Sequence, residues 1–379
     1  MPAFNAQDCV VAALQSVIDQ TEQDFEVIVV DDCSSDETAA VVSAFARGEP
    51  RIRLITLAVN VGPGAARNVA IEAATGNWIA LLDADDRYRP SRLEQLLRMA
   101  MRNGADMVSD NILVCPKDGV KPDSVMFSEA RIPHEKQLTA TEFIAENTNV
   151  GIGGRLSFGF MQPMVRREFL VATNAKYPIN RFGEDFMFAV QCLVLGAKWW
   201  VTPAPLYLYT VRHGSLTDRV AVDDLLAIAM MEQGLIDRLP MLKEAGLEVA
   251  IRKHKKMVDH WRLVVTIKDA LRNRNFDAAF GMVFKSRETM KTVAKILAYN
   301  ALHRLSLVQY NYAERPAIWN KVSNDCSTAY CPPIAEAASV RATDGPDSRR
   351  VVPHGEPAAC RCDYNYQEAT DPDPGTSCG

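Results

Sequence analysis

The first 110 residues alternate between short apolar runs and amphipathic segments, and this alternation constrains the fold more than any other feature of the chain. The apolar runs have the length and composition of strands, and they lie at 25–30, 52–57, 78–82 and 105–109. The intervening segments have helical periodicity, and they lie at 5–18, 34–46, 64–74 and 91–103. Strands separated by helices at this spacing predict right-handed β–α–β units and a parallel sheet.

Two of the predicted strands end in closely spaced acids, which are Asp31 and Asp32 after the first strand and Asp83, Asp85 and Asp86 after the third. The carboxyl ends of parallel strands share one edge of a sheet, where ligands bind in open α/β folds. Crowded carboxylates repel one another unless a cation or hydrogen-bond donors compensate. Their oxygens are the ligands that Mg²⁺ and Mn²⁺ prefer. The pattern predicts a divalent metal site for a phosphate-bearing substrate. The alternatives are acidic turns before the next helices and, for the first pair, hydrogen bonds to a base or ribose.

A glycine-rich turn at 60–68 precedes the third predicted helix. A dinucleotide-binding fingerprint requires glycine at the position of Arg67, so a nicotinamide-dependent oxidoreductase is excluded. An arginine in the first turn of this helix is suited to hold a base or a diphosphate by forked hydrogen bonds. The alternative is an arginine on the helix surface.

Two further segments carry candidate functional residues. Asp185 opens an apolar helix predicted at 183–196, where an acid either favours the helix dipole or serves as a general base. Arg212 and His213 begin a polar loop after a predicted strand at 199–209 that contains two prolines. They could close over a diphosphate, and by themselves they form an ordinary polar loop.

Composition narrows the class of protein. The 379 residues, 48% of them hydrophobic, can bury one large core or two modest ones. A net charge of −5 argues against a dedicated nucleic-acid binder. No window of about 20 residues lacks charge, so no transmembrane helix is predicted. The amino terminus lacks the features of a signal peptide, and four single Cys residues in the body are typical of reduced thiols, so we expect a cytoplasmic protein.

The carboxyl-terminal part differs from the rest. Between 251 and 310 there are thirteen Lys or Arg and four Asp or Glu residues, a net charge of +9. A basic amphipathic helix is suited to adsorb to anionic lipid, and the alternative is a helical cap with a solvated basic face. Residues 313–379 lack periodicity and contain five of the nine Cys, so we expect a disordered tail.

Together these residues resemble glycosyltransferase family 2 of the GT-A fold. The resemblance covers about residues 1–217 and rests on seven motifs in the family's order: 2–6 (PAFNA), 29–34 (VVDDCS), 60–63 (NVGP), 66–68 (ARN), 82–86 (LDADD), 183–185 (GED) and 215–217 (SLT). It implies an α/β nucleotide-sugar-binding fold with a mainly parallel sheet flanked by helices. The expected organisation is a catalytic domain at 1–217, with a nucleotide-binding half at 1–110 and an acceptor half at 111–217, a helical basic region at 218–312 and a tail at 313–379.

The resemblance also implies roles for single residues. It assigns Asp185 as the catalytic base and Asp85 as the ligand of a Mg²⁺ or Mn²⁺ cofactor. The nucleotide-sugar donor would contact Pro2, Asp31, Asp32, Arg67, Asp83, Arg212 and His213. The implied reaction is an inverting transfer from a donor such as UDP-glucose to a saccharide or lipid-linked oligosaccharide acceptor in exopolysaccharide synthesis, at the inner face of the membrane. The alternatives are a nucleotidyltransferase and a non-catalytic nucleotide-sugar-binding module.

The chain departs from the family at its start. Members normally carry an apolar strand before the motif at 2–6, and this sequence begins inside that motif. Losing about four buried Val or Ile side chains would cost roughly 1.5–3 kcal/mol each. We therefore expect either a natural start upstream or another segment that fills the gap.

Overall fold

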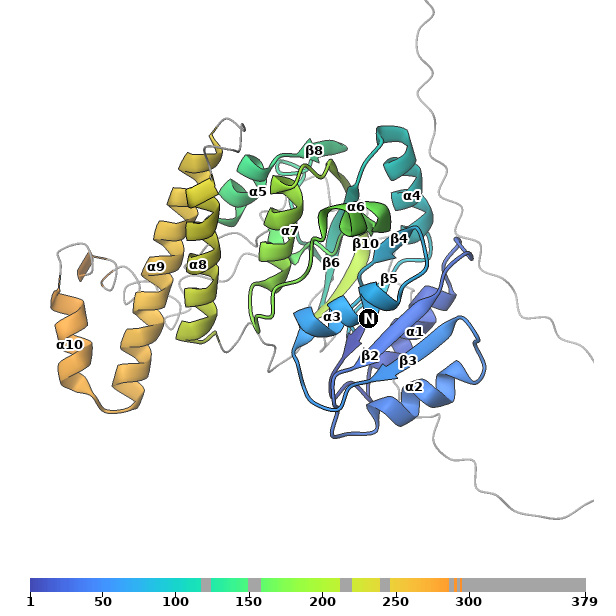
Figure 1. Cartoon of the computed structure of the whole chain (residues 1–379), viewed down its shortest axis with the longest axis horizontal. Helices are drawn as coiled ribbons and strands as arrows, with labels where there is room; N and C mark the ends of the chain where they lie inside the picture. Colours follow the sequence, from blue (N-terminus) through green and yellow to red (C-terminus); the bar gives the residue numbers. More distant parts are fainter. Residues whose placement is uncertain are drawn as a thin grey trace, which may run out of the picture. The chain divides into compact units, whose positions relative to one another are not determined.

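The computed structural model describes residues 1–116, 124–148, 158–211, 220–238 and 246–285, together with 290, 291 and 294 (Figure 1). All of them belong to one compact unit, Met1–Glu314. The predicted tail at 313–379 and the loop at 212–217 lie outside the described residues.

The first sheet contains three parallel strands in the order β1 (Pro2–Ala3), β2 (Val27–Asp31) and β3 (Ile52–Thr56). All five residues of β2 are buried, which is the pattern of a central strand covered on both faces. Three helices accompany this sheet: α1 (Val10–Ile18), α2 (Thr38–Ala46) and α3 (Pro63–Ala73). The predicted β–α–β units of this part of the chain are confirmed.

The second sheet is mixed. Its main path has the order β4 (Trp78–Ala80), β9 (Met164–Arg166), β6 (Met107–Pro116), β10 (Trp199–Val211) and β5 (Arg87–Tyr88), and it also includes β7 (Ser124–Val125) and β8 (Lys136–Leu138). Only β6 and β10 pair in parallel among its described pairs. The prediction of a mainly parallel sheet therefore holds for the first sheet and for this pair. Short antiparallel strands such as β9 carry too few residues for a periodic signal.

Eight helical segments follow α3. They are α4 (Arg92–Asn103), α5 (Ala140–Asn147), the 3₁₀ turn η1 (Phe158–Phe160), α6 (Arg167–Thr173), α7 (Glu184–Val194), α8 (Val222–Arg238), α9 (Leu247–Arg272) and α10 (Phe276–Phe284). The helices predicted at 91–103 and 183–196 correspond to α4 and α7. Helix α9 packs against α5, α8 and α10, so the described part of the basic region is joined to the preceding part of the chain through α5.

A buried ion pair connects α4 to the second sheet. Arg92, which has no exposed surface, donates from Nε to Asp110 at 3.0 Å and from Nη2 to the carbonyl oxygen of Gln162 at 2.7 Å. Its guanidinium lies 4.3 Å from the ring centroid of Tyr88. Because these bonds replace the lost hydration of both charges, they fix the segment that precedes β9.

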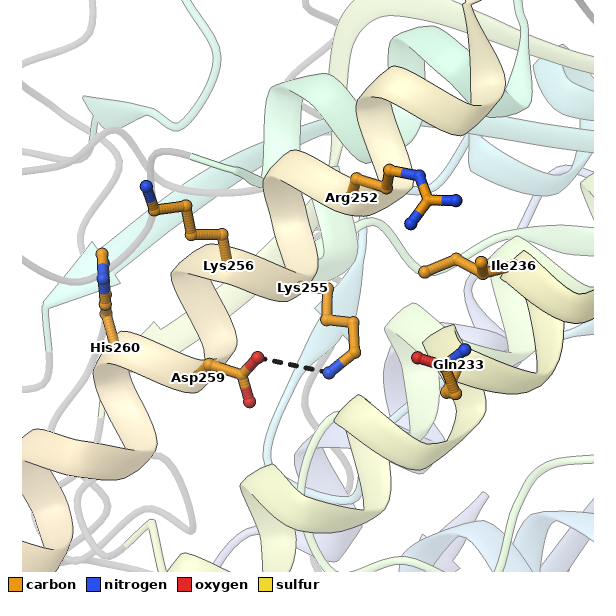
Figure 2. Close-up of a pocket in the computed structure, with 7 residues that line it drawn as sticks. All are labelled: Gln233, Ile236, Arg252, Lys255, Lys256, Asp259 and His260. Atoms are coloured by element: carbon orange, nitrogen blue, oxygen red, sulfur yellow. Dashed lines mark hydrogen bonds and ion pairs between the residues drawn. The ribbon is translucent and has the colours of Figure 1, made fainter.

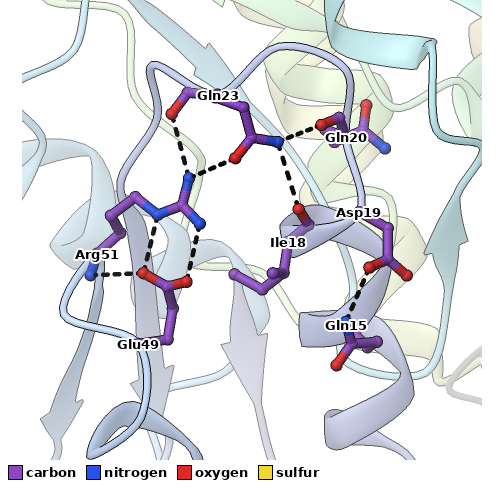
Figure 3. A network of polar contacts seen from close by, with 7 residues as sticks. All are labelled: Gln15, Ile18, Asp19, Gln20, Gln23, Glu49 and Arg51. Atoms are coloured by element: carbon purple, nitrogen blue, oxygen red, sulfur yellow. Dashed lines mark hydrogen bonds and ion pairs between the residues drawn. The ribbon is translucent and has the colours of Figure 1, made fainter. Parts of the chain in front are cut away.

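A second polar network lies at the amino end of β2 (Figure 3). Arg51 donates to the side chains of Glu49 at 2.8 Å and Gln23 at 2.9 Å, and the backbone amide of Val27 donates to the carbonyl of Arg51 at 2.8 Å. This network ties the segment after α1 to the start of β3. The opposite, carboxyl end of β2 carries Asp31 and is the end that concerns function.

Candidate functional site

The carboxyl end of β2 presents two buried acids with different environments. Asp31 is 1% exposed, and its Oδ1 atom has no hydrogen-bond partner among the described residues. Asp32 is 3% exposed, and its two oxygens accept hydrogen bonds from the backbone amides of Val61 at 2.7 Å and Gly62 at 2.8 Å. The side chain of Asp32 therefore shapes the glycine-rich turn, whereas Asp31 retains an unused acceptor.

The glycine-rich turn leads directly into α3. Gly62 has φ of 86°, a left-handed conformation that glycine adopts without strain. Gly64 lies so close to the carbonyl oxygen of Pro178 that a Cβ atom there would be 2.5 Å from it. The turn thus requires glycine for two reasons, one of which is contact with the segment before α7.

Arg67, one turn into α3, is the centre of the site. Its side chain is 4% exposed and forms ion pairs with Asp83 at 2.8 Å, Glu184 at 3.0 Å and Asp185 at 3.1 Å. The ring centroid of Tyr177 lies 5.3 Å from its guanidinium carbon. Acids that are 101 to 102 residues apart in the chain, at 83 and at 184–185, therefore meet at one buried cation. Asp32 holds the turn from which α3 starts, so α3 lies between the contacts of Asp32 and those of Asp83.

The three acids after β4 have separate partners. Asp83 accepts from Gln162 at 3.2 Å with its second oxygen, and Asp86 accepts from the hydroxyl of Tyr207 at 2.7 Å and the amide of Thr210 at 2.8 Å. Burial, with the negative charges of Asp83 and Asp85, raises the pKa of Asp86 well above its ordinary value. Asp85 is half-buried between these two fixed neighbours.

Three acids surround the single cation Arg67, and the pKa values of two of them are raised. Burial raises the pKa of Asp185 to about 8; Arg67 opposes this shift, and the charges of Glu184 and Asp83 add to it. Burial also raises the pKa of Glu184, again against Arg67. A carboxyl group with a pKa near 8 is able to exchange a proton near neutral pH, as a general base must.

The structure places the predicted residues as follows. Arg67 contacts both Asp83 and Asp185, Asp32 bonds to the turn that precedes α3, and Asp31 lies beside Asp32 at the end of β2. Pro2 lies in β1 opposite Val30 of β2, next to this strand end. Arg212 and His213 lie outside the described residues. Among the described residues, no group of three or more His, Cys, Asp or Glu side chains is arranged to hold a metal by itself.

Sequence reasoning missed four residues that complete the site: Glu184, Gln162, Tyr177 and Tyr207. Glu184 stands beside Asp185 at the start of α7, and this doubled acid was a signal for a shared partner. The other three carry no local signal, because each reaches the site through a contact with a distant segment.

Comparisons with known proteins found one matching family and several similar proteins. The model of the family described as Glycosyl transferase family 2 matches residues 1–162. The succinoglycan biosynthesis protein ExoO of Rhizobium meliloti (strain 1021) is 38% identical over 237 residues, which are 62% of this chain and 66% of that protein. The succinoglycan biosynthesis protein ExoU of the same organism is 29% identical over 284 residues, which are 74% of this chain and 80% of that protein.

A solved structure supports the fold. The S. aureus protein TarS, residues 1-349, in complex with UDP-GlcNAc superposes with a TM-score of 0.53 at 20% identity, covering 67% of this chain and 70% of that chain. The mixed α/β body flanked by helices is thus a GT-A fold, as predicted.

Proposed function

Because residues 1–162 match the model of Glycosyl transferase family 2, we propose that this chain transfers a sugar from a nucleoside-diphosphate sugar to a hydroxyl group of a saccharide, with inversion at the anomeric carbon. The observation that carries the proposal is the convergence of Asp83, Glu184 and Asp185 on the buried guanidinium of Arg67. This contact joins the strand ends of the donor-binding half to the helix that carries the candidate base. The two succinoglycan biosynthesis relatives support a role in polysaccharide synthesis.

The donor nucleotide binds at the carboxyl end of β2 in this proposal. Asp31 reads the base, because its Oδ1 atom is a buried acceptor that lacks a donor among the described residues. An N–H group of uracil would supply that donor, which supports a UDP-sugar such as UDP-glucose. Asp32 contributes indirectly by holding the turn at 61–62, and Pro2 borders the same strand end. Asp83 faces the ribose, and Arg67 orients Asp83.

A divalent metal fits the acids after β4. Asp85 supplies a carboxylate oxygen, while Asp83 and Asp86 are held by their own partners. Mg²⁺ and Mn²⁺ are commonly bound by one or two carboxylates together with substrate phosphates, so the oxygen donors present suit either ion. When bound, the metal would neutralise the charge of the leaving diphosphate. Asp85→Ala should therefore abolish the Mn²⁺-dependent increase in UDP affinity.

Asp185 acts as the general base. As the acceptor hydroxyl oxygen bonds to the anomeric carbon, the bond from that carbon to the diphosphate oxygen breaks, and the hydroxyl proton passes to the carboxylate of Asp185. The nucleoside diphosphate leaves with the electron pair. Arg67 keeps the carboxylate oriented through the contact at 3.1 Å. A single displacement of this kind requires one carboxylate at the reacting carbon.

The experiment is a donor screen. Purified protein is incubated with Mn²⁺ and a panel of nucleotide sugars, with and without saccharide acceptors, and free nucleotide is measured. We expect release from a UDP-hexose, with UDP-glucose tested first, and loss of release in EDTA. If no nucleotide is released from any donor with any acceptor of a full panel, including lipid-linked saccharides, the proposal is contradicted.

The acceptor is lipid-linked in our proposal, and helices α9 and α10 bring the protein to the membrane surface. None of the described helices combines the length and apolar character needed to cross a bilayer. A pocket of about 280 Å³ lies between α8 and α9. Figure 2 shows Arg252 and Lys255 of α9 on the side that faces Ile236 and Gln233 of α8. Lys255 pairs with Asp259 at 3.2 Å and Arg252 with Glu248 at 2.8 Å. The cations Arg252, Lys255 and Lys256 outnumber the one acid of the lining, which favours anionic phosphate groups.

Helix α10 carries a stripe of exposed phenylalanine rings next to α9. Phe276, Phe280 and Phe284 repeat every four residues and are 52%, 57% and 65% exposed. Residues four apart lie on one face of a helix, so the rings form a stripe. Arg272 and Arg274 precede the stripe and Lys285 follows it. Aromatic rings flanked by cations are suited to the interface of an anionic bilayer.

Vesicle sedimentation tests the membrane contact independently of activity. The protein should sediment with anionic vesicles at low salt, remain free with zwitterionic vesicles, and be released by high salt. Replacing the three Phe residues by Ser should abolish sedimentation. Met101→Ser, at a site that is 73% exposed on α4, is the matched control and should leave it unchanged. Equal binding by the triple variant would contradict the assignment.

A further inference from the structure

The segment 182–186, which carries Glu184 and Asp185, is held by α8 and α9 on the side away from Arg67. Phe182 meets Trp261 of α9 edge-on, with ring centroids 5.7 Å apart. Gly183 has φ of 76°, which favours glycine, and a Cβ atom there would lie 2.7 Å from the Cδ1 atom of Ile228 in α8. Phe186 stacks on His254 of α9 at 4.6 Å between centroids and 16° between planes.

The ring of Phe186 is enclosed on both faces. Phe143 of α5 stacks on its other face, with centroids 5.7 Å apart and planes at 17°. The three near-parallel rings come from α5, α7 and α9, so a tilt of any one requires movement of the others. Close packing of this kind transmits small displacements because interiors contain little free volume.

The imidazole of His254 is itself fixed. It is 4% exposed and shares a hydrogen bond between its Nδ1 and Oε1 of Glu232 in α8, which is 2% exposed. Two apolar side chains would fill such a position at lower cost than two polar groups taken out of water. The hydrogen bond, however, defines the orientation of the ring plane, which an apolar contact does not. Neither His254 nor Glu232 contacts the donor-binding residues in any described interaction.

The first turn of α7 is thus held from two directions. Glu184 and Asp185 contact Arg67, and the flanking residues Gly183 and Phe186 contact α8 and α9. A shift of Phe186 would move the adjacent carboxylate of Asp185 relative to Arg67 and to the bound donor. The helices that make this contact lie beyond residue 162, where the match to the family model ends.

We infer that His254, oriented by Glu232 and stacked on Phe186, is a positioning residue for Asp185. The inference rests on the proposed role of Asp185 as the general base. It makes the helical region part of the catalytic unit, because α8 and α9 set the position of a carboxylate that they do not touch.

The test compares kinetic constants in the full chain. His254→Ala should lower kcat by roughly 10–10²-fold, since a displacement of about 1 Å can cost 10²-fold, and should leave the donor KM and UDP affinity unchanged. The double variant Glu232→Leu/His254→Phe places a ring against Phe186 again and removes the buried carboxylate of Glu232. It should recover most of the kcat that His254→Ala loses. Val265→Ala is the control: it shortens a buried α9 side chain about 16 Å further along the helix and should leave kcat unchanged.

Crystal structures of the same variants give a readout that does not depend on turnover. The pair between Arg67 and Asp185, 3.1 Å in the wild type, should lengthen in His254→Ala and return in the double variant. Unchanged kcat in a folded His254→Ala protein, or an equal loss in Val265→Ala, would overturn the inference. If the wild type transfers no sugar, the proposed function fails, and the distance in the variant structures alone decides whether His254 positions Asp185.

Discussion

The donor-binding half and the part of the chain after residue 110 are built on different principles. In the first, each candidate residue stands at the end of a strand or in the first turns of a helix, and the elements that carry these residues follow one another in the chain. Asp32 bonds to a turn that immediately precedes α3, and Arg67 follows within that helix. In the second, Asp185 contacts Arg67 of α3, and its neighbours Gly183 and Phe186 contact α8 and α9. The candidate nucleotide site is therefore built from consecutive elements, whereas the candidate base depends on contacts between elements that are remote in sequence.

The largest effect is expected from Asp185→Asn, which changes the candidate base and leaves the donor-binding half unaltered. Asp185→Asn keeps the shape of the side chain and should lower kcat by roughly 10²–10⁴-fold, the usual contribution of a general base. UDP affinity, measured by calorimetry, should stay at the wild-type value because β2 and α3 are unaltered. Full activity of this variant would refute the assignment of Asp185.

Breaking the contact between the two regions should cost stability. Arg67→Met leaves Asp83, Glu184 and Asp185 buried without their cation, and loss of one partner of a buried ion pair costs about 3–5 kcal/mol of unfolding free energy. Urea unfolding measures this value. Arg98→Met provides the control, because the Arg98–Glu94 pair is largely exposed and should cost less than about 1 kcal/mol. Equal losses in both variants would mean that Arg67 does not join the two regions.

A change confined to the donor-binding half should leave the base intact. Asp32→Ala removes the acceptor for two backbone amides, and hydrogen bonds to a charged group contribute about 1.5–3 kcal/mol each. The turn at 61–62 should loosen, and UDP affinity should fall more than kcat at saturating donor. Asp24→Ala, which removes an exposed acid in the segment before β2, is the matched control. An unchanged donor KM would contradict a role for the turn.

The smallest effect is the pH dependence of the intact protein. Burial raises the pKa of Asp185 to about 8, so below that pH the carboxyl group holds the proton that a base must lack. Consequently kcat/KM should rise about tenfold per pH unit between pH 6 and 8 and level off above 8. A flat profile across this range would show that the titration of Asp185 does not limit the reaction.

The same contrast explains what could be predicted from the sequence. The strands and helices of residues 1–110 follow from periodicity, and acids at strand ends mark the positions of Asp31 and Asp83. The roles of Asp31, Arg67 and Asp83 come from the family resemblance and stay predictions. Strand β9 has only three residues, and β10 contains prolines and register shifts, so neither has a clear periodic pattern. The pairing of Arg67 with Glu184 spans 117 residues, and no local pattern encodes it.

The central claim is that one cleft holds the nucleotide at Asp31, the metal at Asp85 and the base at Asp185. The most direct measurement is a crystal structure of the protein with Mn²⁺ and a non-hydrolysable UDP-sugar. The account predicts uracil within hydrogen-bond distance of Asp31, Mn²⁺ between Asp85 and the diphosphate, and the anomeric carbon facing the Asp185 carboxylate. A nucleotide bound away from the end of β2, or an anomeric carbon turned away from α7, would contradict it.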